Sequence, residues 1–337
     1  MEITAGIDGE VLKKMILYSK EEIQFKKDYL DAINVFPVPD GDTGMNMYLT
    51  INKIVTELEK VPSPPTVKAA AKSISKGAFL GSKGNSGVIL SQFLIGLFKH
   101  LENKQVITPK DWAEGMKKGA DKAYKAVVNP REGTILSVIK STAATAEKIV
   151  QNGNADWDTL FKSMYETAVK STLETPEQMP LLKEKGVVDA GAQGFVYVLR
   201  GWLKAIGVKI SEMEQEVKDL FSNVTDKFLR KEKLEYQYCT EIILKPINGV
   251  VTQELHETLT EYGDSIEIIN HDGTYKIHIH TNEPKKVAQE LNVYGEAQLI
   301  KADDMLKQQE ERNSKLSNFM KEIENQGYTG SFQRVPN

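Results

Sequence analysis

Residues 34–46 read NVFPVPDGDTGMN, and this stretch decides how the first half of the chain is interpreted. Its two prolines exclude a helix, because proline disfavours the helical conformation in the residue before it. Asp40 and Asp42 follow on the same loop, and a helix is predicted to begin near Met45, so that its free N–H groups point to the same place. Mg²⁺ needs oxygen ligands in a tight array. The stretch is therefore a candidate Mg²⁺ site, with a solvated turn as the alternative.

The pattern around this stretch is helical from the start of the chain to about Gly207. Apolar residues recur every three to four positions, which is typical of helices with one buried face. Besides the helix near Met45, seven ranges show this pattern: 11–29, 66–80, 86–100, 108–128, 134–151, 157–173 and 190–205. We therefore predict one helical domain of about eight helices over residues 1–207.

The pattern then changes to an alternation of strands and helices. Residues 208–234 are charged and helix-prone, and they are predicted to form a connector. Strands are predicted at 237–244, 265–270, 274–280 and 297–301, and helices at 252–262 and 284–291. The order βαββαβ is that of a ferredoxin-like fold. We predict such a domain over residues 235–310, followed by a charged helix and tail over 311–337.

Composition and charge exclude several classes of protein. Among the 337 residues, 43 Lys and Arg stand against 47 Asp and Glu, so no broad positive field is available for nucleic acid or an anionic membrane. The N-terminus lacks the apolar segment of a signal peptide, and no apolar run is long enough to span a bilayer. The single cysteine, Cys239, excludes an internal disulfide and fits a reducing compartment. We expect a cytoplasmic protein with no nucleic-acid partner and no integral membrane segment.

Three further loops contain small residues at the predicted start of a helix. They are GSKGNSG at 81–87, REGT at 131–134 and GVVDAGAQG at 186–194. Glycines at a helix N-terminus suit a phosphate that approaches the backbone, so four helix N-termini could converge on one nucleotide. Residues 81–87 do not have the spacing of a Walker A loop. Turns and close helix packing are the alternative interpretation of all three loops.

Taken together, these motifs are similar to a known family. NVFPVPDGDTGMNM (34–47), GSKGNSGVILSQ (81–92), EGTIL (132–136) and GVVDAGAQG (186–194) resemble, in this order, the kinase domain of bacterial fatty acid kinase. That domain belongs to the L-domain family of dihydroxyacetone kinases. The resemblance continues through YCT (238–240) and HIHT (278–281), and it covers most of residues 1–310. It implies an all-helical barrel that binds ATP at one end through two Mg²⁺ ions.

The resemblance also implies roles for individual residues. Asp40 and Asp42 correspond to the magnesium-binding aspartates, and the third ligand is Asn34, with Asp31 as the alternative. The residues expected to line the nucleotide phosphates or to close their pocket are Thr43, Asn46, Ser86, Gly87, Thr134, Asp189 and Gly191.

The implied acceptor is a fatty acid held by an acyl-binding partner protein, and the product is an acyl phosphate. A fatty acid carboxylate has a pKa near that of Asp or Glu, about 4, and is ionised at pH 7, so the enzyme needs no general base. Two alternatives stay open. One is a dihydroxyacetone-type kinase that acts on a small soluble hydroxy compound, and the other is a non-enzymatic nucleotide-binding regulator.

Cys239, His278 and His280 are predicted to bind one zinc ion. In a βαββαβ fold the third strand runs antiparallel beside the first, which brings His280 next to Cys239. His278 and His280 are two residues apart and share one face of their strand. We expect the zinc to be structural, because it lies in a different domain from the proposed ATP site; a buried thiol beside two histidines is the alternative. The strand edge of this domain would also permit a homodimer.

Overall fold

The computed structural model of the chain describes residues 6–153, 156–208, 234–247, 252–271, 273–307 and 310. The connector predicted over 208–234, apart from its two end residues, lies outside the described residues. The helix and tail predicted over 311–337 also lie outside them. The extents of these two segments therefore stay predictions.

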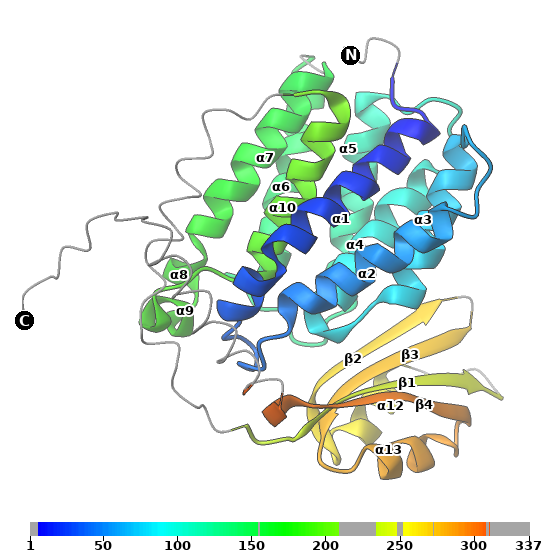
Figure 1. The fold of residues 1–337 in the computed structure, drawn as a ribbon, viewed down its shortest axis with the longest axis vertical. Helices are drawn as coiled ribbons and strands as arrows, with labels where there is room; N and C mark the ends of the chain where they lie inside the picture. The colour runs from blue at the N-terminus through cyan, green and yellow to red at the C-terminus, as the bar shows by residue number, and fades with distance from the viewer. Residues whose placement is uncertain are drawn as a thin grey trace, which may run out of the picture.

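The first part of the chain is an all-helical barrel (Figure 1). Each long helix packs against the next, and the last long helix closes the ring by contacting both the long helix before it and the first one. Within the described part of residues 6–208, eight helices have 15 to 24 residues: α1 (Gly9–Ala32), α2 (Thr43–Leu58), α3 (Val67–Gly81), α4 (Gly84–Leu101), α5 (Pro109–Lys125), α6 (Ile135–Gln151), α7 (Trp157–Leu173) and α10 (Ala190–Ile206). The predicted fold of about eight helices is confirmed.

Side-chain caps and an aromatic core explain why these helices form. Asp8, for example, accepts a hydrogen bond from the backbone N–H of Val11 and thereby satisfies one of the free donors at the start of α1. Inside the barrel, the rings of Trp112 and Trp202 meet edge to face at 5.2 Å, and both side chains are fully buried. Such contacts fill the interior and hold the ends of the helices in fixed positions.

Two short helices were not predicted from the sequence. They are α8 (Thr175–Gln178) and α9 (Pro180–Lys185), and each has a proline in its first turn. A proline there leaves no additional donor unsatisfied, but four to six residues are too few to show a helical period.

The second part is a four-stranded antiparallel sheet with two helices. The strands are β1 (Tyr238–Pro246), β2 (Gly263–His271), β3 (Thr274–Thr281) and β4 (Gly295–Asp304), and the helices are α12 (Thr252–Leu259) and α13 (Pro284–Leu291). Their order in the sheet is β2-β3-β1-β4, with every neighbouring pair antiparallel. This is the strand order of a ferredoxin-like fold, as predicted.

The two faces of this sheet differ sharply. Ile242 of β1 and Ile277 of β3 belong to an apolar cluster with Leu255 of α12 and Val287 of α13. The opposite face is covered by one end of the helical barrel, as Figure 1 shows. Contacts between α4 and β2 lie in this interface. The sheet is therefore buried on both sides, one side apolar and the other rich in polar groups.

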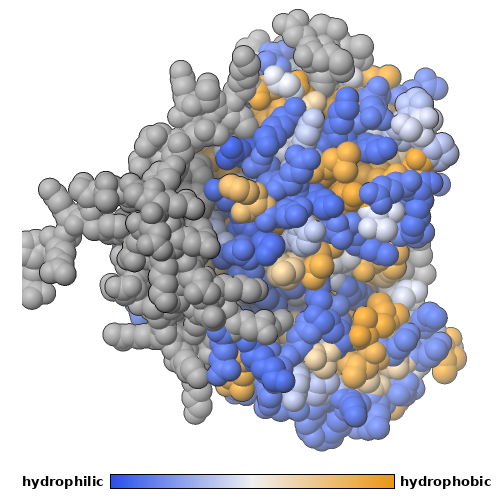
Figure 2. Space-filling model, viewed as in Figure 1, coloured by the Kyte–Doolittle hydropathy of each residue, from blue (hydrophilic) through white to orange (hydrophobic). Residues whose placement is uncertain are grey.

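The outer surface is mainly hydrophilic, with scattered hydrophobic residues on the face that Figure 2 shows. Ile247 and Val293, both in the sheet domain, are more than 80 % exposed, at 81 % and 82 %. Among the described helices, none is both long and apolar enough to cross a bilayer. The homodimer expected through the sheet domain stays a prediction.

Candidate active site

The loop between α1 and α2 is held in place by hydrogen bonds of its own residues. Asn34 donates through its amide nitrogen to the carbonyl of Val38 at 2.8 Å and to Asp40 Oδ1 at 2.9 Å. Thr43 Oγ1 donates to Asn34 Oδ1 and lies 3.2 Å from Ser86 Oγ at the start of α4. The predicted Mg²⁺ loop is thereby joined to the predicted phosphate loop.

Asn34 and Asp31, the two candidates for the third ligand, lie in different environments. Asp31 is buried and accepts a hydrogen bond at 3.0 Å from the backbone N–H of Met45, so it caps the start of α2. Burial raises the pKa of Asp31 to about 7. Asn34 lies in the wall of a small cavity together with Asp40 and Asp42. Asn34, unlike Asp31, therefore lines the same cavity as the two aspartates.

This cavity lies between the barrel and the sheet. Its volume is about 10 Å³, which is enough for one water-sized ligand. Burial raises the pKa of Asp42, while Asn46 and the positive charge of Lys83 oppose that rise. Carboxylates in such a place favour a bound cation, because a cation offsets the cost of burying their charge. The residues lining the cavity are Asn34, Pro37, Val38, Asp40, Asp42, Gly84, Asn85, Ser86, His278 and His280.

The loop at 81–87 depends on glycine for its close approach to α2. Gly84, the first residue of α4, has a φ of +56°, and a Cβ there would clash with the side-chain nitrogen of Asn46. A Cβ on Gly87 would lie 2.6 Å from Thr50 Oγ1. Asn46 and Gly87 thus lie where α2 and α4 pack together, and neither lines the cavity. The close packing of these two helices explains why position 87 is a glycine.

Asp189 connects the starts of α6 and α10. Its Oδ1 accepts hydrogen bonds from the backbone N–H groups of Ile135, at 2.9 Å, and of Ala192, at 2.7 Å. Thr134 caps α6, and Gly191 packs against Ile135. Burial raises the pKa of Asp189 to about 6, although the two N–H donors oppose this rise.

A larger pocket of about 540 Å³ adjoins the small cavity, and the two share Pro37, Asn85 and Ser86. The barrel contributes helix N-termini and apolar side chains to it, while the sheet domain contributes α12 and the start of β2. Two of its polar residues, His256 and Glu267, belong to no motif that indicated a site, whereas Arg131 lies in the loop 131–134 without having been singled out as a site residue. Glu267 is 7 % exposed, and among the described residues its Oε2 has no hydrogen-bond partner.

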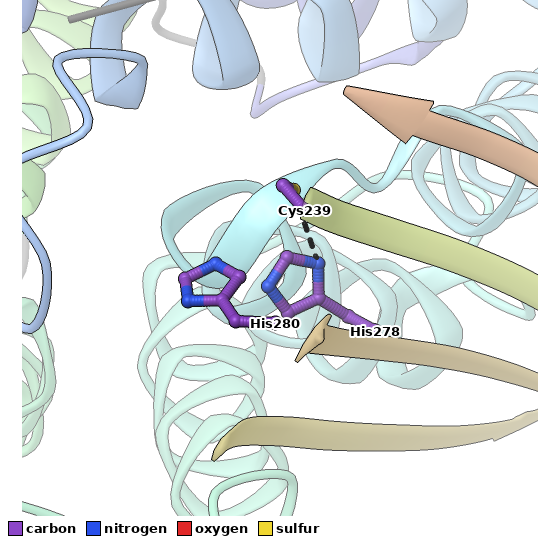
Figure 3. A group of neighbouring side chains, drawn as sticks. All are labelled: Cys239, His278 and His280. Atoms are coloured by element: carbon purple, nitrogen blue, oxygen red, sulfur yellow. Dashed lines mark hydrogen bonds between the residues drawn. The ribbon is translucent and has the colours of Figure 1, made fainter. Parts of the chain in front are cut away.

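The three predicted zinc ligands meet as the strand order requires (Figure 3). Cys239 pairs with His280 in the β1–β3 register, and Cys239 Sγ lies 3.8 Å from His278 Nδ1. One ligand atom from each residue lies within 4.8 Å of the others, and all three side chains are buried. Among the described residues, His278 Nε2 lacks a hydrogen-bond partner, and His280 Nδ1 lies 3.5 Å from Asp264 Oδ1.

The chemistry of these three residues fits zinc. One thiol sulfur and two imidazole nitrogens are ligands that Zn²⁺ prefers. Burial lowers the pKa of His278 well below its usual range, which keeps the imidazole neutral and able to bind a metal. Burial raises the pKa of Cys239, whereas a bound cation would favour its thiolate.

The two predicted metal sites are adjacent, although their residues come from different domains. His278 and His280 line the same small cavity as Asp40 and Asp42. The negative charge of Asp42 also contributes to the raised pKa of Cys239. The sequence could not show this proximity, because it depends on how the sheet docks onto the barrel.

Comparison with known proteins agrees with this architecture. A DAK2 domain model matches residues 37–204, and the model of a FakA-like middle domain, from fatty acid kinase, matches residues 235–312. An uncharacterised protein of Staphylococcus epidermidis is 37 % identical over 313 residues, which cover 90 % of this chain and 56 % of that protein. A relative from Staphylococcus saprophyticus is 37 % identical over 317 residues, covering 92 % of this chain and 57 % of its own length.

Among solved structures, the dihydroxyacetone kinase from C. freundii in complex with AMP-PNP and Mg²⁺ matches with a TM-score of 0.44 and 15 % identity, covering 58 % of this chain and 33 % of that one.

The barrel and its matching model define a DAK2-domain protein. The second match makes this more specific: the chain belongs to the family in which a DAK2 domain is joined to a FakA-like middle domain of fatty acid kinase. The chain spans somewhat more than half the length of the two Staphylococcus relatives.

Proposed function

We propose that the chain is an ATP-dependent kinase that phosphorylates the carboxylate of a fatty acid, held by an acyl-binding partner protein, to give an acyl phosphate. One observation carries this proposal. The acidic loop at Asp40 and Asp42 meets the N-termini of α2, α4, α6 and α10 around two adjoining cavities. Helix N-termini attract phosphates, and carboxylates bind the Mg²⁺ that accompanies them.

The donor set of the small cavity fits Mg²⁺. Asp40, Asp42 and Asn34 supply carboxylate and amide oxygens, which are the ligands that Mg²⁺ prefers. We propose that these residues bind the two Mg²⁺ ions from the side of the small cavity, while the β- and γ-phosphates of ATP lie toward the adjoining larger pocket. When bound, the ions would offset the charge that develops on the transferred phosphoryl group.

The remaining residues act by binding and orientation. Ser86 lies in the wall of both cavities, so its hydroxyl and the N-terminus of α4 are placed to donate hydrogen bonds to phosphate oxygens. Thr43 holds Ser86 from the α2 side. The larger pocket has room for the nucleoside, with Asp189 and Thr134 at its wall. Because a fatty acid carboxylate is already ionised at pH 7, these residues have no proton to remove from the acceptor.

We also propose that Cys239, His278 and His280 hold one zinc ion. It would connect β1 to β3 and rigidify the wall that the sheet contributes to the small cavity. Zinc in proteins usually has four ligands, so these three residues leave a fourth position that a carboxylate or a water would fill.

The test compares binding and turnover in the full chain and in two variants. We expect Asp40→Ala and Asp42→Ala each to lower phosphoryl transfer to a fatty acid on its acyl-binding protein by about 100-fold or more, the effect typical of losing one charge-stabilising group. Far-UV circular dichroism should stay unchanged, because both residues lie on a loop. Asp158→Ala, at an exposed position on α7, is the matched control.

The outcomes separate the alternatives. Unchanged transfer in either aspartate variant would refute the Mg²⁺ assignment. Phosphorylation of a small hydroxy compound, but not of the carried fatty acid, would indicate a dihydroxyacetone-type kinase. Nucleotide binding without turnover in the presence of loaded carrier would indicate a regulator.

A further inference from the structure

One buried lysine of the sheet domain reaches into the barrel. Lys276 lies on β3, two residues before His278, and its side chain is on the same polar face. It is only 6 % exposed, and its Nζ donates to the backbone carbonyl of Ser82. Ser82 is the C-cap of α3 and belongs to loop 81–87.

A second contact holds the next residue of that loop. Lys83 Nζ lies 3.8 Å from Asp303 Oδ2 on β4, and Lys301 also pairs with Asp303. The counter-ion of Lys276 is Glu241 on β1, at 3.5 Å. Strands β1, β3 and β4 thus act together on two consecutive loop residues.

These contacts lie close to the candidate phosphate site. Gly84, Asn85 and Ser86 follow directly after Ser82 and Lys83, and all three line the small cavity. Only two residues, Ser82 and Lys83, separate the last residue of α3 from the first residue of α4, so a shift at Ser82 would move the start of α4. The position of the predicted phosphate-binding groups therefore depends on where Ser82 is held.

The cost of burying Lys276 indicates that the contact is specific. Removing an ammonium group from water is unfavourable even after the protein relaxes around it. A well-packed apolar pair is often no less stable than a buried ion pair. A carbonyl at the C-terminal end of α3 also carries the negative end of the helix dipole, which favours a cation there.

We propose that Lys276 is a positioning residue: it holds loop 81–87 from the sheet domain in the conformation that receives the nucleotide phosphates. The inference rests on the proposed nucleotide binding and adds that the barrel requires the sheet domain for it. Lys276 touches the loop and not the phosphates, so it acts through Ser82.

The test uses the full chain and the pair Lys276→Met and Glu241→Gln. The single variant Lys276→Met leaves Glu241 buried without its partner, which alone would destabilise the sheet. The double variant removes both charges and is expected to unfold within a few degrees of the unaltered chain. Lys285→Met, at an exposed lysine of α13, is the control.

Two quantities are measured: the Kd for AMP-PNP with Mg²⁺ by calorimetry, and amide hydrogen exchange of residues 81–87. In the double variant we expect Kd to rise about tenfold or more, the typical effect of losing one charge-assisted hydrogen bond. Exchange of the loop should accelerate, while that of α5 and α7 stays unchanged. The control should match the unaltered chain in both measurements.

Two outcomes would overturn the role of Lys276 and leave the proposed function unaffected. One is an unchanged Kd in a folded double variant, and the other is a raised Kd while hydrogen exchange in the loop stays unaltered. Absence of nucleotide binding by the unaltered chain would instead overturn the proposed function, and the positioning role with it.

Discussion

Replacing Asp189 should change the free energy of unfolding by an amount that follows from two hydrogen bonds and from the pKa of its carboxyl group. Its Oδ1 is the acceptor for backbone N–H groups of both α6 and α10. Asp189→Ala leaves these two donors without their acceptor, and each buried donor without a partner costs about 1–3 kcal/mol. We therefore expect the alanine variant to lose about 2–6 kcal/mol of stability. Asp189→Asn retains one acceptor oxygen and should keep both bonds.

The pH dependence separates charge from hydrogen bonding at the same position. Burial raises the pKa of Asp189 from 3.8 to about 6 in the folded chain. Between these two values the folded state binds more protons than the unfolded state, so this group lowers stability as pH rises. About two pKa units correspond to about 3 kcal/mol, reached near pH 7 and almost absent at pH 4.

The assay is urea unfolding followed by far-UV circular dichroism between pH 4 and pH 7.5. Asp189→Asn should be about as stable as the unaltered chain near pH 4 and up to about 3 kcal/mol more stable at pH 7. Other groups, Asp31 among them, titrate in the same range. Their contribution is the same in both proteins, so it cancels when the free energy of unfolding of one is subtracted from that of the other. The reasoning would be refuted if the difference in free energy of unfolding between Asp189→Asn and the unaltered chain did not change with pH. It would also be refuted if Asp189→Asn were as unstable as Asp189→Ala at pH 7.

The remaining predictions concern the metal ligands and the loop glycine. Elemental analysis should find about one zinc per chain, and the Cys239→Ser, His278→Ala double variant should lose it; no zinc in the unaltered chain would exclude the site. Gly84→Ala should lower the thermal midpoint and weaken Mg²⁺-dependent nucleotide binding, because its φ is +56° and its Cβ would clash with a buried side chain. Gly153→Ala, at a φ of +77° with no atom within 4 Å of the added Cβ, should cost only about 1 kcal/mol and leave binding unchanged.

Local features of the fold were predictable because their causes lie in the sequence. Periodic apolar residues indicated seven of the eight long helices, and the eighth, α2, was expected to begin near Met45 after the proline-containing loop. The order of elements indicated which strands are neighbours. That order alone placed Cys239 beside His280, as the strand register confirms. The two short helices α8 and α9 escaped prediction because they contain too few residues to show a period.

The docking of the two domains was not predictable, and most of the missed residues belong to it. Alternation shows that Lys276 and His278 share a face, but it does not show what that face contacts. The carbonyl that Lys276 reaches is 194 positions away in the sequence. Likewise, the sequence left both Asn34 and Asp31 as candidates, and only the fold shows that one lines the cavity while the other caps α2.

The polar face of the sheet explains why the candidate site lies where the two domains meet. Antiparallel sheets commonly leave one face to water, where polar side chains cost nothing, yet this face is buried against the barrel. Among the described residues, Glu241 Oε1, Glu267 Oε2 and His278 Nε2 lack hydrogen-bond partners, and His280 Nδ1 lies 3.5 Å from Asp264 Oδ1. Buried polar atoms without partners are rare and need a reason.

The three atoms without partners belong to neighbouring residues, since Glu241 and Glu267 each pair with His278 in the strand register. An apolar interface would join the two domains at lower cost. These polar groups lie next to the cavity lined by Asp40 and Asp42. Because the barrel supplies the carboxylates and the sheet supplies the histidines, neither domain alone contains the whole candidate site.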